Sequence, residues 1–282
     1  MIELQGVSVR YQERYALHDV SLTVPAGQRV AVVGANGAGK TTLFRCLLDL
    51  VPYTGAIHID GLDARRDGVR ARSRMGYVPQ VPAFPPRLTA AEVVALFQQL
   101  RGVLPDPLPV LEEVGLGPHA DKMIRTLSGG MVRRLALAVA SIGSPPVLLL
   151  DEPTSYLDRD GEELLLDRIA SAAEASRTLL VASHHLRGLE AHVDRMILLD
   201  DGRVVADALT AELWSRHWVE IIAPPPPPPA LPCGVRLLSR RNGALHLRVP
   251  DAQIWETVRA LSGRPFRIHE PAPEDLLRES EP

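Results

Sequence analysis

Hydrophobic and polar residues alternate along two early stretches of the chain, residues 2–9 and 17–24. Alternation with a period of two predicts strands that bury one face, so we expect two half-buried strands here. Three later runs, residues 30–33, 147–150 and 179–182, are apolar without interruption. Such runs are typical of strands covered on both faces in a parallel sheet. The pattern therefore predicts a small β subdomain followed by an α/β core.

Helical spacing of apolar residues marks the segments between these strands. It occurs at residues 43–50, after the first apolar run and a glycine-rich stretch, and at residues 135–142. Thr89 is expected to begin another helix, because Glu92 stands three residues further on and completes a capping box. These signals predict a helical subdomain at about residues 82–143.

A run of six prolines, residues 224–229, interrupts the pattern near the C-terminal end. Consecutive prolines adopt an extended polyproline helix of about 3.1 Å per residue, which makes this run a stiff spacer of roughly 20 Å. The run could instead be a ligand for an SH3-type domain. We favour the spacer, because it requires no partner.

The residues after the prolines predict a small α+β extension. Alternating residues flank Asn242-Gly243, a strong hairpin signal, and a helix from Asp251 to Gly263 and a short strand follow. Fewer than 50 residues rarely sustain a core alone, so this extension should pack on the rest of the chain or on a second copy. The predicted organisation is a domain at 1–222, a linker at 223–234 and the extension at 235–282.

Composition narrows the function classes. No apolar run approaches the roughly 18 residues of a membrane helix, so we expect a chain that is neither inserted nor secreted. The net charge of −3 gives no general attraction to nucleic acid, and none is expected as a partner. Cys46 and Cys233 lie in a predicted helix and in the linker, which suits a reducing compartment.

The stretch from Gly34 to Thr42 fits the phosphate-binding pattern G-x-x-x-x-G-K-[ST], between a predicted strand and a predicted helix. Its glycines let successive N–H groups point into one concavity at the positive end of the helix, where a di- or triphosphate can bind. Lys40 would reach the β- and γ-phosphates, and Thr41 would hold Mg²⁺. The candidate nucleotide-binding residues here are Gly34, Asn36, Gly37, Gly39, Lys40, Thr41 and Thr42.

Further candidates follow the buried strands. Asp151 and Glu152 end the apolar run at 147–150, where two adjacent carboxylates are costly unless a cation or a water uses them. Asp151 suits Mg²⁺ and Glu152 suits the attacking water. Gln80 stands where a strand leaves the sheet and can face a bound ion. His184 follows the strand predicted at 178–182, on the side where parallel sheets bind ligands.

Two more candidates depend on position alone. Ser128, Gly129 and Gly130 precede a strong helical pattern and so form a second helix N-terminus able to bind an anion. Tyr11 falls between the first two predicted strands. Its ring could stack on an adenine or could equally be an ordinary edge-packing residue.

The order of these features resembles the ATPase subunit of ATP-binding-cassette (ABC) transporters, from Ile2 to about Leu213. The resemblance implies a P-loop NTPase cassette with a mixed sheet core, a small antiparallel β subdomain and a helical subdomain. It also implies the cofactors ATP and Mg²⁺. By position, Tyr11 resembles the adenine-stacking aromatic, Gln80 the glutamine that senses Mg²⁺ and the membrane partner, and Glu152 the general base. His184 resembles the histidine that contacts the γ-phosphate, and Asp158 the residue that links two sites across a dimer.

Three positions depart from the usual pattern: Met131 in place of glutamine, Tyr156 in place of a small residue, and His185 in place of an acidic one. The sequence Leu-Ser-Gly-Gly-Met is similar to bacterial exporters whose ATPase is a separate polypeptide. The resemblance therefore implies a hydrolase that powers export. The alternatives are the ATPase of an energy-coupling-factor or cobalt-type importer, and a soluble cassette protein without a transport role.

The resemblance also implies partners. Two chains, in a homodimer or a heterodimer, would pair head to tail, so that Ser128 of each closes over the nucleotide held by Lys40 of the other. Separate transmembrane permease subunits would hold the pair at the inner face of the cell membrane. The proline-rich segment and helix at 83–100 would form the groove for the permease, although an ordinary turn into a core helix fits the same residues.

Overall fold

The computed structural model describes residues 1–153, 176–183 and 192–210, together with the backbone of four strands within residues 218–269. The chain divides into two compact units, Met1–Asp207 and Ala208–Pro282. Each unit is described by itself below.

The first unit begins with an antiparallel sheet. Its strands are β1 (Ile2–Tyr11), β2 (Arg14–Val24), β4 (Thr54–Ile59) and β5 (Leu62–Asp63), in the order β2-β1-β4-β5. Alternate side chains of β1 and β2 are buried, among them Leu4, Val7 and Leu22, as the sequence pattern predicted. This sheet is the predicted antiparallel β subdomain.

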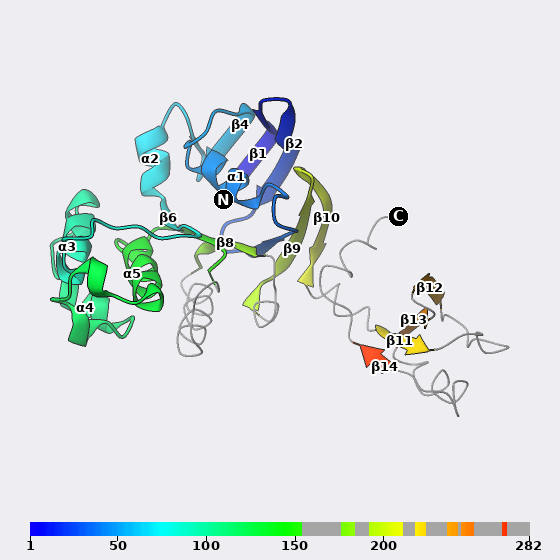
Figure 1. Ribbon diagram of the computed structural model, residues 1–282. Helices are drawn as coiled ribbons and strands as arrows, with labels where there is room; N and C mark the ends of the chain where they lie inside the picture. Colours follow the sequence, from blue (N-terminus) through cyan, green and yellow to red (C-terminus); the bar gives the residue numbers. More distant parts are fainter. Residues whose placement is uncertain are drawn as a thin grey trace. The chain divides into compact units, whose positions relative to one another are not determined.

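A second, six-stranded sheet forms the centre of the unit (Figure 1). Its order is β10-β9-β3-β8-β7-β6, and the five strands from β9 to β6 run parallel. The uninterrupted apolar runs lie in β3, β7 and β8, which are almost entirely buried. The bounds of the six strands are β3 (Arg29–Val33), β6 (Met75–Val78), β7 (Val147–Asp151), β8 (Thr178–Ser183), β9 (Arg195–Asp200) and β10 (Arg203–Leu209).

Helix α1 (Lys40–Leu47) joins the two sheets through one hydrophobic core. Its residues Leu43, Phe44 and Leu47 are at most 1% exposed and pack with side chains of both sheets. Because only residues 34–39 separate β3 from the helix, this packing holds the loop between them against the sheet. Helix α2 (Gly68–Ser73) buries only Ala71 and is otherwise largely exposed.

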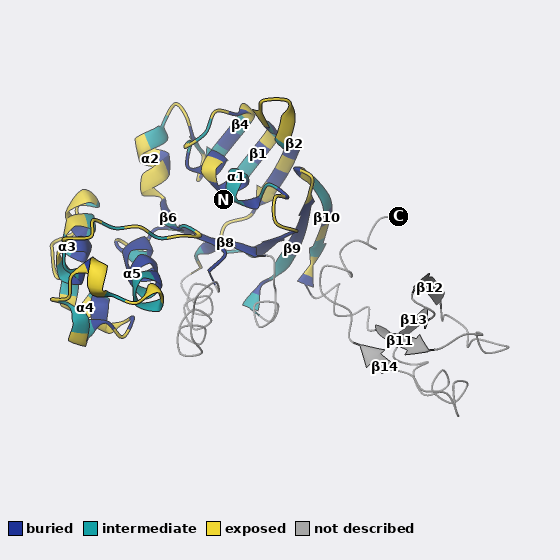
Figure 2. Cartoon of the chain, in the orientation of Figure 1, coloured by how far each residue is buried: buried dark blue, intermediate teal, exposed yellow. Residues whose placement is uncertain are grey.

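Three helices gather beside the β6 edge of the sheet and form the predicted helical subdomain (Figure 1). Thr89 and Glu92 make both hydrogen bonds of the predicted capping box. The subdomain has its own hydrophobic core, seen as the inner, buried faces of the helices in Figure 2. Its helices are α3 (Ala90–Leu100), α4 (Pro107–Glu112) and α5 (Gly129–Ser141), with short 3₁₀ helices at Gly117–His119 and Ile124–Thr126.

Gly76 lets α5 approach β6 more closely than any side chain would allow. A Cβ atom at this position would lie 2.0 Å from the carbonyl oxygen of Ala140 in α5, far inside van der Waals contact. On the same strand, Arg101 donates through Nη2 to the carbonyl oxygen of Met75 at 2.7 Å. The helical subdomain is therefore attached to β6 by backbone contact as well as by side chains.

The second unit contains a four-stranded antiparallel sheet in the order β12-β13-β11-β14. The predicted hairpin is present as β12 (Arg236–Arg241) and β13 (Ala244–Pro250), and the short last strand is β14 (Arg267–His269). The sequence analysis did not predict β11 (Trp218–Ala223). The predicted helix after Asp251 and the six-proline run lie outside the described residues.

Strand β11 groups with the second unit. It pairs with β13 and β14, so its backbone hydrogen bonds belong to the second unit. The sequence analysis assigned residues 218–222 to the first domain and Ala223 to the linker, because the prolines that follow are the stronger composition signal. The contacts divide the chain earlier, between Asp207 and Ala208.

Candidate functional site

The loop between β3 and α1 is held tightly by backbone geometry. Gly39 has φ = 108°, in the region that favours glycine, and a Cβ atom there would lie 2.4 Å from the carbonyl oxygen of Ala16. Helix α1 begins at the next residue, Lys40, so the free N–H groups of its first turn face the loop. This is the strand, glycine loop and helix that the sequence predicted.

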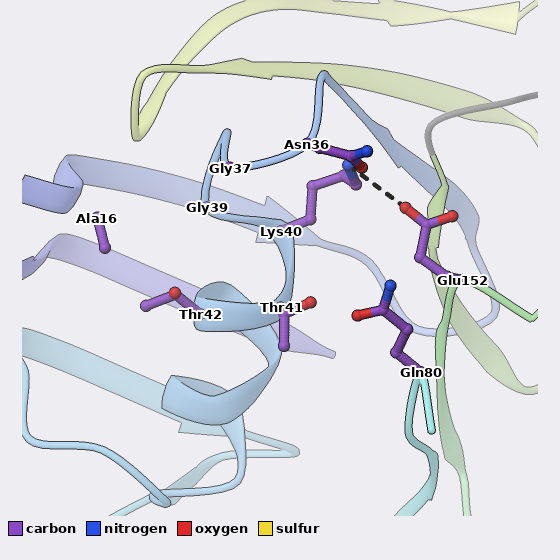
Figure 3. A pocket seen from close by; sticks show the side chains of 9 residues that line it. All are labelled: Ala16, Asn36, Gly37, Gly39, Lys40, Thr41, Thr42, Gln80 and Glu152. Carbon is purple, nitrogen blue, oxygen red and sulfur yellow. Dashed lines mark ion pairs between the residues drawn. The ribbon is translucent and has the colours of Figure 1, made fainter. Parts of the chain in front are cut away.

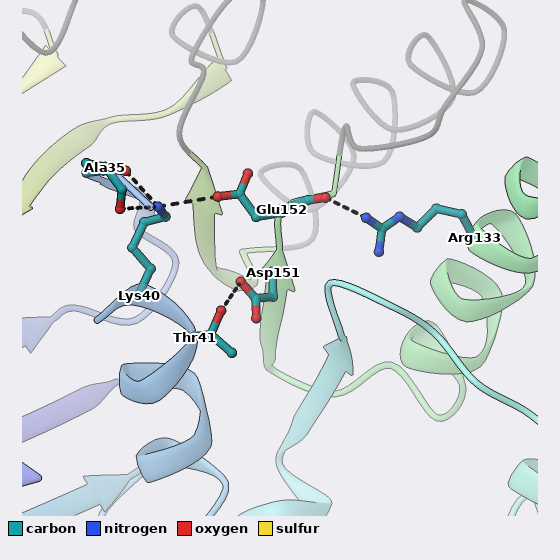
Figure 4. A network of polar contacts seen from close by, with 7 residues as sticks. Ala35, Lys40, Thr41, Arg133, Asp151 and Glu152 are labelled. Atoms are coloured by element: carbon teal, nitrogen blue, oxygen red, sulfur yellow. Dashed lines mark hydrogen bonds and ion pairs between the residues drawn. The ribbon is translucent and has the colours of Figure 1, made fainter. Parts of the chain in front are cut away.

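Lys40 is the centre of the charges in this loop. It is only 6% exposed, and its Nζ donates to the carbonyl oxygen of Gly34 at 2.6 Å and to that of Ala35 at 3.2 Å. The same Nζ lies 3.4 Å from Oε1 of Glu152, which is equally buried (Figure 4). A buried ammonium therefore balances a buried carboxylate, and both face the concavity of the loop.

Asp151, at the end of β7, is completely buried. Its Oδ1 accepts a hydrogen bond from Thr41 Oγ1 at 3.2 Å. Within the part of the chain that the structure describes, its other oxygen, Oδ2, is buried without a hydrogen-bond partner. Burial raises the pKa of Asp151, and the hydrogen bond from Thr41 opposes that rise.

A bound divalent cation would explain this arrangement. Carboxylate and hydroxyl oxygens are the protein ligands that Mg²⁺ prefers, and an oxygen left without a donor is free to ligate. Nearby, burial and the negative charge of Asp151 together raise the pKa of Tyr77 to about 12, so the phenol stays neutral. The donor set of Thr41 and Asp151 therefore fits Mg²⁺.

Glu152 has a strained backbone. Its φ is +48°, in the left-handed region, which costs a non-glycine residue on the order of 1–3 kcal/mol. Hydrogen bonds hold it on both sides: its N–H donates to the carbonyl oxygen of Ala182 at 2.8 Å, and its carbonyl oxygen accepts from Arg133 Nη2 at 2.5 Å. The turn in the chain takes the Glu152 side chain out of the sheet and toward Lys40.

These residues line one open pocket of about 290 Å³. Figure 3 shows the glycine loop on one side, with Glu152 and Gln80 opposite it. Eight of the lining residues were predicted from the sequence, whereas Ala16 of β2 was not. The lining residues are Ala16, Asn36, Gly37, Gly39, Lys40, Thr41, Thr42, Gln80 and Glu152.

Other predicted residues lie elsewhere in the first unit. Ser128 is the N-cap of α5, where its Oγ accepts from the N–H of Met131 at 3.2 Å, and it is exposed together with Gly129. These residues and Gly130 do not line the pocket. Gly34 is buried beneath the loop, where its carbonyl oxygen accepts from Lys40.

Tyr11 ends β1 and is 46% exposed, outside the residues that line the pocket. Tyr15, on the neighbouring strand, is exposed to the same extent and directly precedes Ala16. The sequence analysis did not consider Tyr15. Asp158 and His184, and the departures at Tyr156 and His185, lie outside the described residues.

The sequence analysis also missed Arg133. This arginine of α5 is 2% exposed, and its guanidinium donates to two backbone carbonyls beside the pocket. Its position within the apolar stretch of a helix was the available signal, because a charged residue there requires buried partners.

Comparison with known proteins identifies the class to which this fold and site belong. The sequence profile of the family described as "ABC transporter" matches residues 17–155. The chain is 35% identical over 212 residues to Nod factor export ATP-binding protein I of Burkholderia lata, covering 73% of this chain and 70% of that protein. It is 34% identical over 219 residues to the protein of the same name from Ralstonia nicotianae, covering 76% and 68%.

Solved structures agree with the sequence relatives. An ATP-binding subunit of an ABC transporter matches with a TM-score of 0.71 and 28% identity, over 76% of this chain and 92% of that one. A dimeric ATP-binding cassette in a post-hydrolysis state, bound to ADP and Pi, matches with a TM-score of 0.66 and 28% identity, over 74% and 99%. The chain belongs to the ABC transporter family and is an ATP-binding cassette ATPase. Its predicted α/β cassette fold is confirmed.

Proposed function

We propose that the chain is the ATP-hydrolysing subunit of an exporter whose membrane-spanning part consists of separate subunits. The observation that carries the proposal is the site itself: Lys40 of the glycine loop pairs with Glu152, beside the buried contact between Thr41 and Asp151. Export is supported by the relatives, which are named as export ATP-binding proteins. An energy-coupling-factor or cobalt-type importer remains the alternative, with Met131 and the proline-rich segment after Gln80 favouring export.

Phosphate binding would rest on the loop and Lys40. The N–H groups at the start of α1 point into the concavity, and the helix dipole favours negative charge there. Lys40 donates to the carbonyls of Gly34 and Ala35 in the structure. A triphosphate would offer stronger, charged acceptors, so we expect Lys40 to exchange carbonyl oxygens for β- and γ-phosphate oxygens.

Thr41 and Asp151 would hold Mg²⁺, with Gln80 facing it from the opposite side of the pocket. When bound, the ion would neutralise negative charge on the β- and γ-phosphates. The buried Oδ2 of Asp151, which has no hydrogen-bond partner among the described residues, supports this assignment. The carboxylate would then change from a buried charge that lowers stability into a ligand that binding stabilises.

Glu152 would act as the general base. Its carboxylate faces the pocket 3.4 Å from Lys40 Nζ, and a carboxylate in this position can accept a proton from water. His184 would contact the γ-phosphate, as its position in the family's sequence pattern implies. Catalysis would depend mainly on positioning and on neutralising the charge of the transferred phosphoryl group.

A second cassette would complete each site. Ser128 and Gly129 are exposed at the N-terminus of α5, where an anion is favoured, and they do not line this chain's own pocket. The dimeric cassette among the solved relatives supports pairing of two chains, in a homodimer or a heterodimer. Asp158 would link the two sites, and Tyr11 would stack on the adenine.

The membrane subunits would dock on the helical subdomain. Leu96 and Leu100 lie one turn apart on α3 and are 40% and 72% exposed, and Val81 just beyond Gln80 is 74% exposed. Phe84 packs instead against Phe97, with ring centroids 6.2 Å apart, inside the subdomain core. No helix within the described ranges is long and apolar enough to cross a bilayer. Docked on the membrane subunits, the chain would be peripheral, on the inner face of the membrane.

Replacing Glu152 with Gln tests this function. The amide keeps the shape of the side chain but cannot take a proton, so we expect E152Q to bind ATP and to release phosphate at least about 100-fold more slowly. Phosphate release by purified wild-type and mutant protein measures the effect, with calorimetry to confirm ATP binding. Equal turnover by the two proteins would show that the base is elsewhere.

A further inference from the structure

We propose that Arg133 is a positioning residue that couples the helical subdomain to the two hydrolytic groups of the pocket, Gln80 and Glu152. This inference rests on the proposed function, because it assigns Arg133 a role in the hydrolysis carried out by that site. It concerns the rate of hydrolysis and leaves nucleotide binding to the glycine loop.

The contacts of Arg133 join three parts of the fold. Its Nη1 donates to the carbonyl oxygen of Pro79 at 2.6 Å. Its Nη2 donates to the carbonyl oxygen of Glu152 at 2.5 Å (Figure 4). Pro79 follows β6 and directly precedes Gln80, whereas Glu152 follows β7. One side chain from α5 therefore holds the backbone of both segments at the point where each leaves the sheet.

A guanidinium is suited to this task. Its N–H groups form a rigid planar fork, so two acceptors bound to Nη1 and Nη2 are fixed relative to each other as well as to the helix. The side chain is 2% exposed, so water does not compete for these two bonds. If either carbonyl moved away, its oxygen and the guanidinium N–H group that it binds would each need a new hydrogen-bond partner in a buried place, which is unfavourable.

Glu152 depends on such support because of its backbone conformation. A non-glycine residue at φ = +48° persists only when its surroundings hold it. The N–H of Glu152 is tied to β8 through Ala182, and its carbonyl is tied to α5 through Arg133. Without the second contact, we expect the peptide after Glu152 to rotate and the carboxylate to lose its fixed position opposite Lys40.

The position of Arg133 on α5 links its contacts to the end of the helix that is expected to meet a second chain. Helix α5 starts at Gly129, so Arg133 lies about one turn from the N-terminus that is expected to meet the partner's nucleotide. A shift of that helix end would move the guanidinium and, with it, the carbonyls of Pro79 and Glu152. Arg133 would thereby couple closure of the shared site to the position of the base.

Arg101 provides a matched control. It also reaches from the helical subdomain to β6, where it donates through Nη2 to the carbonyl oxygen of Met75 at 2.7 Å, at the end of the strand away from Gln80. Its guanidinium is half-buried, which lowers its pKa. Losing Arg101 removes an arginine-to-carbonyl attachment of the same subdomain without touching the pocket.

The experiment compares R133M, R133K and R101M in the full chain, by kcat for phosphate release, by Kd for ATP and by melting temperature. We expect R133M to lower kcat by about 10–100-fold, the range for a misplaced catalytic group, with Kd for ATP within about threefold of wild type. R101M should lower the melting temperature yet keep kcat within about threefold. R133K, which keeps the charge but lacks the planar fork, should lose at least about tenfold in kcat.

Two results would overturn the inference. One is a kcat for R133M and R133K no lower than that of R101M, and the other is an ATP affinity that weakens as much as kcat falls. If R133M does not fold, R133K decides between these outcomes, because it retains volume and charge. Failure of the proposed function looks different: the wild type would then not hydrolyse ATP, or E152Q would match it.

Discussion

At the scale of single residues, the site is a balance of buried charges. Lys40, Asp151 and Glu152 are each at most 6% exposed; Lys40 and Glu152 line one pocket, and Asp151 bonds to Thr41, which lines it too. Lys40 and Glu152 neutralise each other, whereas Asp151 is supported mainly by Thr41. Burying the Asp151 carboxylate lowers the stability of the fold. Such a cost is typical of a charged group that binds a ligand.

The burial of Asp151 predicts how the stability of the protein depends on pH. Because burial raises the folded-state pKa of Asp151 above its ordinary value of 3.8, its contribution to stability is fully present below that value. The contribution is lost as the pH rises through the raised pKa, since the ionised form is disfavoured in the folded protein. We expect D151N, which cannot ionise, to gain stability relative to wild type over this window, on the order of 1 kcal/mol.

Urea unfolding of the nucleotide-free protein at a series of pH values measures the difference. Stimulation of ATP binding by Mg²⁺, followed by calorimetry, should be lost in the same variant. A constant difference between D151N and wild type across pH would contradict the raised pKa, and undiminished Mg²⁺ stimulation would remove Asp151 from the ion site.

At the scale of elements, α3 combines a structural face with a free one. Val93 and Val94 are fully buried in the subdomain core, whereas Leu96 and Leu100 are exposed on the adjacent face. Since exposed leucines one turn apart do not stabilise the isolated subunit, this face is the strongest candidate for docking to the membrane subunits.

A charge at Leu100 should separate docking from chemistry. In cells that naturally make the protein, we expect L100E to move the chain from the membrane fraction to the soluble fraction. Its purified ATPase activity should stay within about twofold, since surface substitutions away from a site have small effects. Q99E, at an exposed neighbouring position, is the matched control for the added charge. Membrane recovery of L100E equal to that of Q99E would exclude this face as the docking site.

The pairing of β11 also determines where the chain can be truncated without leaving an unpaired strand. A truncation after Ala223 keeps β11 but removes its partners β13 and β14, leaving an unpaired strand that favours aggregation. A truncation after Leu209 removes the whole sheet and keeps β10 intact. We expect the shorter protein to stay monodisperse and to bind ATP within about threefold of the full chain, since no described residue of the second unit lines the pocket.

Light scattering and calorimetry on the two truncated proteins check this expectation. Aggregation should be confined to the longer fragment. A folded protein ending at Leu209 that no longer binds ATP would instead give the second unit a role in the nucleotide site.

At the scale of the whole molecule, the question is how many chains make one site. Ser128 is exposed at the start of α5 and outside the pocket that contains Lys40. In a head-to-tail pair, a K40A chain mixed with an S128R chain gives a heterodimer with one site damaged twice and the other intact. Each homodimer has both sites damaged, so we expect ATPase activity to return on mixing, to about one quarter of wild type if the chains pair at random and one intact site suffices.

Phosphate release by the mixture and by each variant alone measures this recovery. Ser128 also caps α5, so S128R should lose about 1 kcal/mol of stability, and its melting temperature must be checked first. An E152Q protein that stays monomeric with ATP at micromolar concentration would contradict the shared site.

The sequence by itself determined the parts of this protein whose signals are local. The alternating strands, the apolar strands, the capped helix at Thr89 and the glycine loop each depend on residues close together in the chain, and the structure contains all of them. The site residues of the loop, together with Asp151 and Glu152, were predictable for the same reason: their chemistry is set by what directly precedes and follows them.

Only the tertiary structure decided which of these parts meet. The sheet order places β7 between β6 and β8, and this brings Gln80, Glu152 and Arg133 together although they are far apart in sequence. The partner of β11 is β13, across the proline run, which no local pattern encodes. The residues of each segment determine its secondary structure and the chemistry of its side chains. Its place in the fold depends on backbone groups far away in the sequence, because a buried N–H or C=O group requires a hydrogen-bond partner.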